Sequence, residues 1–511
     1  MEVLCGIDVP VFVLLLLLAT FLLYLYGTWP YGQWRSMGID GPPTQPFFGN
    51  MRQMAKKGFP YALWEWSKKY GRTYGIYQNR IPLLVTSDLD ILKEINTIPL
   101  SPKEVKAGVF FAGGDDWKRI RNIITPTFSA GKLKLMEHFI NRCGVVLADS
   151  LRKEAARKNK ADVKEYFGAY TLDVIAGTAF GLEVNSQHDH SEPFVSNLKT
   201  MMSNAGRGST LLTLYFIMPF FAPVLRIFAA MMRPTPVRFF LDNIYRMVEE
   251  RKQEKTDERP VDFLQLLINA ESSEDDKANG GTAVPAVHKR LARHEIVGQA
   301  FIFFVAGYET TATTLQYLTY NLAMHPDVQE RVVREIQQQL GDEKPTYENV
   351  GKLKYLEHAI YETLRVFPPV TSITRTASET VTIKGMTIPK GSAVLVPICD
   401  VLRDPEYFPD PETFNPDRWE GANKNDVSFL PFGFGPRLCI GMRLALLEIK
   451  IAMVHVLRAV KFNKTPDLPE KIVFRPSSGL LPPASPIMIE VEERQHSSTI
   501  SSSNGKLSTR L

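Results

Sequence analysis

The chain has 511 residues, with 60 Lys and Arg against 55 Asp and Glu and a formal net charge of +5. This excess is too small and too dispersed for a nucleic-acid binder, which concentrates positive charge on one face. Glycine and proline are near ordinary usage and 44% of the residues are hydrophobic, which excludes collagen-like and wholly disordered chains. The four cysteines form no CxxC pair, so neither a disulfide framework nor a zinc site is expected.

The N-terminal segment, residues 1–30, is predicted to be a signal-anchor transmembrane helix. Residues 9–26 carry no charge, and a helix of that length spans ~27 Å, close to a thin bilayer core. Aromatic residues end the run and basic residues follow later, which is typical of an interface belt with the C-terminal bulk in the cytosol. The alternative is a cleaved secretory signal, which would want a basic start. A stiff Pro-rich linker is expected over residues 31–50.

Two hairpins are predicted farther along the chain. Residues 73–86 should turn around residues 78–80. Residues 381–396 should turn at residues 384–385, with a further turn at residues 390–391. Most other periodic stretches are helical, so the expected fold class is mostly α with a small β part.

A long helix is predicted between Pro285 and Pro326. Residues 295–324 are apolar nearly all round, which is typical of a helix buried in a large protein. Residues 271–281 are expected to form a polar loop, and residues 494–511 a Ser-rich disordered tail.

Cys439 follows a Gly-rich turn within residues 429–441 and precedes a helix predicted over residues 442–460. A sulfur at a helix N-terminus faces the helix dipole and free backbone N–H groups, and both favour the thiolate. Such a thiolate can be an axial metal ligand; the alternative is a buried structural cysteine. The turn also contains glycines that allow a flat ligand to approach closely: Gly433, Gly435 and Gly441.

The pattern F-x-x-G-x-R-x-C-x-G is the haem-binding motif of the cytochrome P-450 family, and the chain resembles that family from the anchor to about residue 493. The strings AGYETT at residues 306–311 and PRLCIGMR at residues 436–443 resemble its microsomal third clan and the 3A subfamily. The resemblance implies a cytochrome P-450 fold with one haem domain over residues 51–493. It also implies haem b and O₂, with Cys439 as the iron ligand. The motif is formed by Phe432, Gly435, Arg437, Cys439 and Gly441.

An oxygen-activation site is expected in the middle of the long helix. Thr310 can hydrogen-bond the carbonyl four residues back, that of Ala306. The small residues Ala306 and Gly307 leave space beside a bound oxygen, and Glu309 next to Thr310 combines an acid with a hydroxyl for proton delivery. The resemblance implies that Glu309 and Thr310 are catalytic. The alternative is a helix that tolerates Thr at a packing site.

Four residues are implied by the resemblance to hold the haem edge. Trp117 and Arg121 are spaced i, i+4 and share a helix face, matching the family's W-x-x-x-R. Arg375 and Arg437 match its other propionate-binding positions, where the guanidinium fork suits a carboxylate.

A structural triad is expected beside the cysteine loop. Glu362 and Arg365 are spaced i, i+3 on one helix, which Pro368 and Pro369 end. With Arg418 they match the family's E-R-R triad, whose implied role is to fix the cysteine loop against the core.

The resemblance also identifies apolar segments that line the substrate, at residues 211–232, 301–306, 370–374 and 477–481. Phe301, Phe303 and Phe304 offer apolar contact, but successive helix residues diverge by about 100°, so not all three can face the haem. Residues 211–232 are expected to dip into the membrane surface as a substrate entry. An ordinary core helix and a second span, which its two prolines and Arg226 disfavour, are the alternatives.

The resemblance therefore implies a membrane-bound haem-thiolate monooxygenase that inserts one oxygen atom of O₂ into bulky lipophilic substrates such as steroids, fatty acids and xenobiotics. No dinucleotide fingerprint appears, so electrons must come from another protein, implied to be NADPH-cytochrome P-450 reductase. The implied location is the endoplasmic reticulum membrane, with the catalytic domain on the cytosolic side. One alternative is a lipid-peroxide isomerase similar to thromboxane synthase, which the Glu309–Thr310 pair disfavours. The other is a haem carrier or gas sensor.

Overall fold

The computed structural model describes residues 10–94, 108–158, 160–189, 193–205, 235–253, 262–271, 290–423, 426–476 and 479–495. The predicted membrane-dipping patch at residues 211–232 lies outside the described residues. So do nearly all of the predicted polar loop and of the Ser-rich tail, and two positions of the substrate-lining segment at residues 477–481.

Helices make up most of the described chain. The α-helices are α1 (Val11–Thr28), α2 (Gln33–Ser36), α3 (Met51–Lys57), α4 (Phe59–Tyr70), α5 (Leu89–Glu94), α7 (Gly114–Ile124), α8 (Ala130–Arg157), α9 (Val163–Phe180), α10 (Pro193–Ala205), α13 (Thr235–Gln253), α14 (Phe263–Asn269), α15 (Arg293–Met324), α16 (Pro326–Leu340), α17 (Lys354–Val366), α18 (Ile398–Val401) and α19 (Met442–Ala459). The strands are β1 (Thr73–Gln78), β2 (Ile81–Thr86), β3 (Lys160–Asp162), β4 (Ser372–Thr376), β5 (Val381–Ile383), β6 (Met386–Ile388), β7 (Ala393–Pro397), β8 (Val460–Asn463) and β9 (Met488–Glu493).

Both predicted hairpin regions form strands. The strands β1 and β2 pair antiparallel around Asn79, whose φ of +54° supplies the tight turn. In the second region β5 and β6 turn at Lys384 and Gly385, and β7 then leaves that pair. It joins the larger sheet instead, in the order β1-β2-β7-β4, where it is parallel to β2 with Leu83 opposite Ala393.

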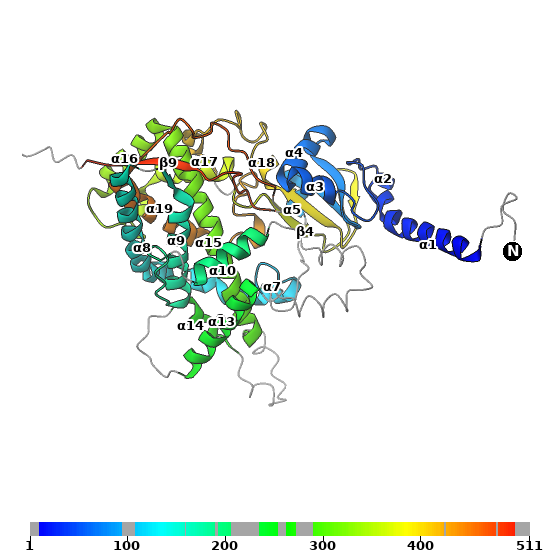
Figure 1. Cartoon of the computed structure of the whole chain (residues 1–511), viewed down its shortest axis with the longest axis horizontal. Helices are drawn as coiled ribbons and strands as arrows, with labels where there is room; N and C mark the ends of the chain where they lie inside the picture. Colours follow the sequence, from blue (N-terminus) through cyan, green and yellow to red (C-terminus); the bar gives the residue numbers. More distant parts are fainter. Residues whose placement is uncertain are drawn as a thin grey trace, which may run out of the picture.

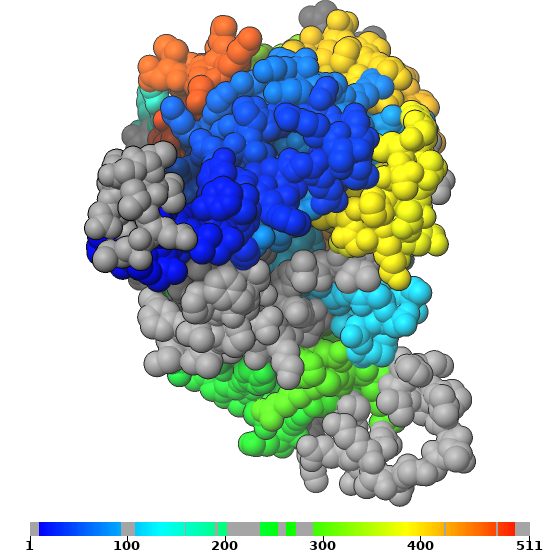
Figure 2. Space-filling model, turned by 90° about the vertical axis from the view of Figure 1, so that its right-hand side faces the viewer, coloured from blue at the N-terminus to red at the C-terminus, as the bar shows by residue number. Residues whose placement is uncertain are grey.

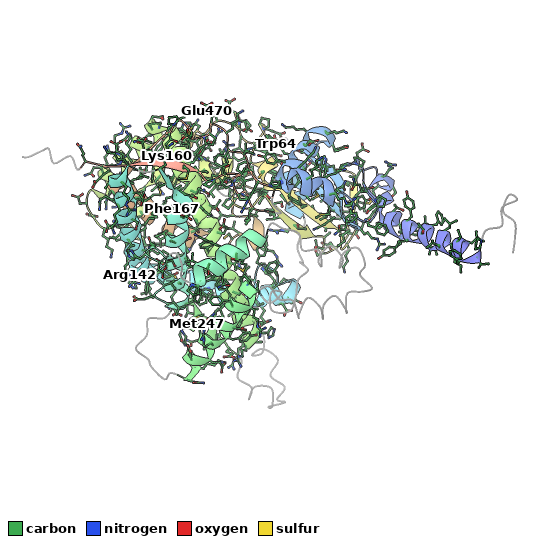
Figure 3. All side chains as sticks on the ribbon, in the orientation of Figure 1. Trp64, Arg142, Lys160, Phe167, Met247 and Glu470 are labelled. Atoms are coloured by element: carbon green, nitrogen blue, oxygen red, sulfur yellow. The ribbon has the colours of Figure 1, made fainter. Side chains whose placement is uncertain are left out.

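The long helices α8, α9, α13, α15, α16 and α19 gather at one end of the molecule, and this sheet lies towards the other end with α1 to α5 (Figure 1). In the helical part α15 packs along α9, and α8 packs on α9 and α19. The helix α15 is buried on all sides from Thr311 to Ala323, as its uniformly apolar sequence predicts. Phe167, labelled on α9 in Figure 3, is fully buried in this helical core.

The N-terminal helix α1 is exposed along nearly its whole length. Within the described residues, Val11–Ser36 is one helical stretch whose length and composition would allow it to cross a membrane. A core helix of this length would be buried, so its exposure fits the predicted anchor.

Residues 31–50 are packed against strand β1, whereas the sequence predicts a stiff spacer there. Trp34 is 3% exposed and its indole N–H donates to the Ile76 carbonyl at 3.1 Å. A Cβ added to Gly41 would lie 1.9 Å from the Gly75 carbonyl oxygen, so only glycine allows this close approach of two backbones. Figure 2 shows the dark blue N-terminal segment lying against the lighter blue region that contains β1 and β2.

Candidate functional site

The cysteine loop leads directly into α19, as the sequence predicts. Gly433 and Gly435 adopt φ values of +74° and +65°, which glycine reaches without steric cost. The loop closes when the Cys439 backbone N–H donates to the Phe432 carbonyl at 2.8 Å. The helix α19 begins three residues after Cys439, with Gly441 at its N-cap.

Cys439 is an exposed residue, so a ligand can approach it. The protein packed around it nevertheless raises the pKa of the thiol, because burial disfavours the charged form. The backbone N–H groups of Gly441 and Met442 and the Arg121 guanidinium favour the thiolate but do not outweigh burial. A metal cation bound at the sulfur would offset the effect of burial and stabilise the thiolate, since metal ligation deprotonates a thiol.

The helix α7 brings Trp117 and Arg121 against the cysteine loop. An Arg121 Nη group donates to the Leu438 carbonyl at 2.8 Å, at the residue before the cysteine. The Arg437 guanidinium lies over the Trp117 ring at 4.5 Å and donates to the Ala112 carbonyl at 2.7 Å. Arg437 therefore meets Trp117 and Arg121 at one place, although it lies far from both in the sequence.

Arg375 joins this group from strand β4. Burial lowers the pKa of Arg375 to about 10, and burial with the charges of Arg375 and Arg121 lowers the pKa of Arg437 to about 10. Within the described part of the chain, none of the three forms an ion pair with a carboxylate, and the buried Nε of Arg437 has no hydrogen-bond partner. Three cations held together in this way need an anionic ligand. The two propionates of haem fit that requirement.

Arg119, which the sequence analysis did not single out, fastens α7 to α15. Its guanidinium reaches both carboxylate oxygens of Glu295, one at 3.0 Å, and donates to the Arg290 carbonyl at 2.9 Å. Glu295 also accepts the Ala292 backbone N–H at 2.8 Å and so caps α15. The spacing could have indicated this role. Arg119 is two residues from both Trp117 and Arg121, so it lies on the opposite face of the helix.

The middle of α15 presents Thr310 and Ala306 on its accessible face. The Thr310 hydroxyl donates to the Ala306 carbonyl at 2.7 Å, the hydrogen bond that the sequence predicts. Ala306 is exposed and Thr310 is half-buried. A small residue and a hydroxyl thus lie together on a side of the helix that a ligand can reach.

Glu309 does not turn towards Thr310. Its carboxylate accepts from the Lys164 ammonium on α9 at 2.9 Å and from the Thr313 hydroxyl at 3.2 Å. Lys164 also donates to the Thr313 hydroxyl at 2.8 Å, which closes a three-membered hydrogen-bond network. The sequence analysis missed Lys164, because nothing in its local pattern indicates a partner 145 residues away.

The three phenylalanines before Ala306 are core residues. Phe301, Phe303 and Phe304 are all buried, and the Phe303 ring lies 4.3 Å from that of Phe263 on α14. The partly exposed apolar side chains of this turn are instead Ile302 and Val305. The apolar contact expected of these phenylalanines is thus made with the protein core, because α9, α13 and α14 cover that side of α15.

The triad Glu362, Arg365 and Arg418 is present beside the loop, with the first two buried and Arg418 half-buried. Glu362 and Arg365 both have 0% side-chain exposure and pair through two hydrogen bonds at 2.8 and 3.0 Å. Arg418 Nε donates to Glu362 at 2.9 Å. Trp419 and the Asn415 backbone add two more donors to the same carboxylate, which anchors the segment before the cysteine loop to α17.

Comparison with known proteins agrees with this geometry. Residues 39–491 match the family described as Cytochrome P450. The chain is 37% identical to human cytochrome P450 3A7 over 498 residues, 94% of this chain and 96% of the relative. It is 36% identical to pig cytochrome P450 3A29 (97% and 99% covered) and 37% identical to dog cytochrome P450 3A12 (95% and 97%). The chain belongs to the cytochrome P450 family and is an oxidoreductase, a monooxygenase that uses haem b and O₂.

Proposed function

We propose that the chain is a membrane-bound monooxygenase of bulky lipophilic compounds, with steroids, fatty acids and xenobiotics as the substrate class. The observation that carries the proposal is the exposed Cys439 just before α19, next to three half-buried arginines without a carboxylate partner among the described residues. Cys439 is the proposed iron ligand, and Trp117 with the three arginines would hold the propionates. When bound, the thiolate-ligated haem supplies the oxygen-activating chemistry.

The protein's own contribution begins at the sulfur. The backbone N–H groups of Gly441 and Met442 hydrogen-bond to it, and such groups tune the electron density that a ligand donates. Phe432 closes the loop through its carbonyl and, with Gly435, fixes the backbone that carries Cys439. These contacts orient the ligand before any substrate binds.

Proton delivery is proposed for Thr310 and Glu309. The Thr310 hydroxyl can pass on a proton at the accessible face of α15 while the Ala306 carbonyl fixes its position. Glu309, held by Lys164 on the other side, would bring protons from the α9 side of the helix.

The proposed substrate class follows from the accessible face of α15. Ile302, Val305 and Ala306 are apolar, and Thr310 is the hydroxyl beside them. Apolar contacts are not directional, so such a face favours large lipophilic molecules over one small polar compound. The similarity to several cytochromes P450 of the 3A group supports the same class.

The proposed electron donor is NADPH-cytochrome P450 reductase. The chain carries no dinucleotide fingerprint, so electrons must arrive from another protein. The exposed apolar helix α1 is proposed to anchor the chain in the endoplasmic reticulum membrane, with the haem domain in the cytosol.

The test is a turnover assay of the full-length protein in lipid with reductase and NADPH, across steroids, fatty acids and drug-sized compounds. Oxygenated products that require the reductase would support the proposal. Conversion of a lipid peroxide without reductase would indicate an isomerase instead. No turnover in either case, with haem bound, would indicate a carrier or sensor.

Replacing Thr310 with alanine should leave haem content unchanged but divert reducing equivalents from product to peroxide. Proton transfer by a positioned side chain contributes about 10²–10⁴-fold to rate, so product per NADPH should fall by at least about tenfold. The measurement is NADPH oxidation against product and peroxide. Thr314→Ala, one turn farther along α15 and bonded to the Thr310 carbonyl, is the matched control. Wild-type coupling in Thr310→Ala would contradict the role.

Replacing Arg437 with leucine should accelerate haem loss. Hydrogen bonds to charged groups contribute about 1.5–3 kcal/mol, so dissociation should be about 10- to 100-fold faster. The measurement is haem transfer to apomyoglobin. Lys118→Leu is the control, because Lys118 is exposed on α7 and pairs only weakly with Asp115 at 3.5 Å. Equal rates in the two variants would remove Arg437 from the haem site.

A further inference from the structure

The last turn of α1 is fixed by two contacts, one with residues 31–50 and one with the β1–β2 hairpin. The Phe47 backbone N–H donates to the Gly27 carbonyl at 3.1 Å, although Phe47 itself adopts a φ of +65°. A Cβ added to Gly27 would lie 2.7 Å from the Phe47 ring. The guanidinium of Arg80, beside the β1–β2 turn, lies 3.6 Å from the centroid of the Tyr26 ring. We call Tyr26, Gly27, Phe47 and Arg80 the anchor joint.

The segment after α1 continues this attachment. The Tyr31 hydroxyl accepts the Gly49 backbone N–H at 2.9 Å and donates to the Asn79 carbonyl at 3.3 Å. The Trp34 backbone N–H donates to the Tyr77 hydroxyl at 3.2 Å. Tyr31, through its hydroxyl, and Trp34, through its backbone N–H, therefore connect the end of α1 to the same hairpin. A flexible tether between helix and domain would show no such series of contacts.

The anchor joint lies where the surface of a bilayer would be. Tyr26 precedes the end of α1 at Thr28 by two residues, a rise of ~3 Å. The headgroup layer on each side of a bilayer is roughly 5–7 Å thick. Trp29 is 83% exposed and Tyr24 54%, as expected for aromatic side chains at that level. Arg80, in contact with Tyr26, must therefore lie among the headgroups if α1 spans.

Arg80 has the chemistry to bind there. Within the described residues it forms no ion pair with a carboxylate, and its Nε is buried without a hydrogen-bond partner. Its guanidinium fork matches the geometry of a phosphate group. The ring of Tyr26 holds the guanidinium in place from one side.

We propose that the anchor joint makes α1 and the β1–β2 hairpin one rigid unit, and that the hairpin turn rests on the bilayer with Arg80 bound to an anionic lipid headgroup. This inference rests on the proposed membrane anchoring. Its consequence is a single fixed tilt of the haem domain on the membrane, set by the contacts of Gly27 and Phe47.

The first test compares two glycine variants of the full-length chain in oriented bilayers of phosphatidylcholine and phosphatidylserine. Gly27→Leu should collide with Phe47, whereas Gly32→Leu meets nothing within 4 Å of its added Cβ. Polarised absorption of the haem should give the same narrow tilt for wild type and Gly32→Leu, and a broadened or shifted tilt for Gly27→Leu. The carbon monoxide spectrum shows that each variant is folded, and Gly27→Ala provides a milder change. A wild-type tilt in both Gly27 variants would overturn the joint.

The second test concerns the charge of the lipid headgroup. Both lipids carry a phosphate, but choline neutralises it in phosphatidylcholine, so only phosphatidylserine presents a net negative charge. Hydrogen exchange of residues 78–81 should be about fivefold slower in nanodiscs that contain phosphatidylserine than in phosphatidylcholine alone, since one Arg near an anionic surface contributes ~1 kcal/mol. Arg80→Gln should lose this difference. Arg72→Gln should keep it, because Arg72 precedes the other end of β1 and pairs with Asp404 and Glu406. A lipid dependence that survives in Arg80→Gln would overturn the assignment of Arg80 to an anionic headgroup.

Failure of the anchoring itself would appear differently. If the full-length chain is released from membranes by alkaline carbonate, both the anchoring and the joint are wrong. If the chain stays in the membrane but Gly27→Leu keeps the wild-type tilt, the anchoring stands and the joint alone is wrong.

Discussion

Replacing Cys439 with alanine should give a folded protein without the red-shifted carbon monoxide band of a thiolate haem, and without turnover. The reason is geometric: Cys439 lies at the start of α19 with accessible surface, next to the arginines that would hold the propionates. Alanine removes the sulfur but keeps the backbone bond from residue 439 to the Phe432 carbonyl. The loop should therefore persist, so the loss can be assigned to the ligand.

The matched controls are Cys143→Ala and Cys399→Ala. Both cysteines are buried, and burial raises the pKa of each thiol to about 12, so neither should bind iron. The carbon monoxide band should survive in both. If it survives in Cys439→Ala as well, the assignment of the iron ligand is wrong.

Replacing Glu362 with alanine should prevent accumulation of haem-loaded protein. Glu362 receives five hydrogen bonds, and its removal would leave the fully buried Arg365 without its counter-charge. Breaking a buried pair from one side costs about 3–5 kcal/mol, out of a typical total of 5–15 kcal/mol. Glu362→Gln should also lower stability. The carboxylate oxygens only accept hydrogen bonds here, whereas the glutamine NH₂ group would face N–H donors and could not accept from them.

The measurement is the yield of haem-loaded protein and the temperature at which the carbon monoxide band disappears. Asp417→Asn is the control: Asp417 pairs with Arg331 at 2.8 Å, but both side chains are about half exposed, and exposed pairs contribute 0–1 kcal/mol. Equal stability of Glu362→Ala and Asp417→Asn would show that the triad does not hold the loop.

Much of the fold could be predicted because its signals are local. The apolar run at residues 295–324 corresponds to α15 (Arg293–Met324), and the helix predicted after Cys439 is α19 (Met442–Ala459). The turn at Asn79 follows from residue types that tolerate a positive φ. Each of these features depends on neighbouring residues, so a single sequence contains the information.

The rest depends on which segments meet. The sequence predicts Glu309 as the partner of Thr310 because the two are adjacent. The Glu309 carboxylate instead pairs with Lys164 of α9, on another side of the helix. Residues 31–50 read as a spacer because of their prolines, although Trp34 and Ile39 in that stretch are buried. Pairings between distant segments are set by how elements cross, which periodicity does not specify.

The parallel pairing of β2 with β7 also delays completion of the sheet during synthesis, because β7 is made long after β2. Leu83 needs Ala393 as its neighbour in the sheet, and an isolated two-stranded hairpin is at best marginally stable in water. At ~5–20 residues per second, the roughly 310 residues between the two strands take ~15–60 s to leave the ribosome. During that interval the hairpin edge is open to wrong partners. Trp34 packs onto Ile76 and Gly75, and all three residues are already synthesised by then. This packing can protect one face of the hairpin while its edge is still unpaired.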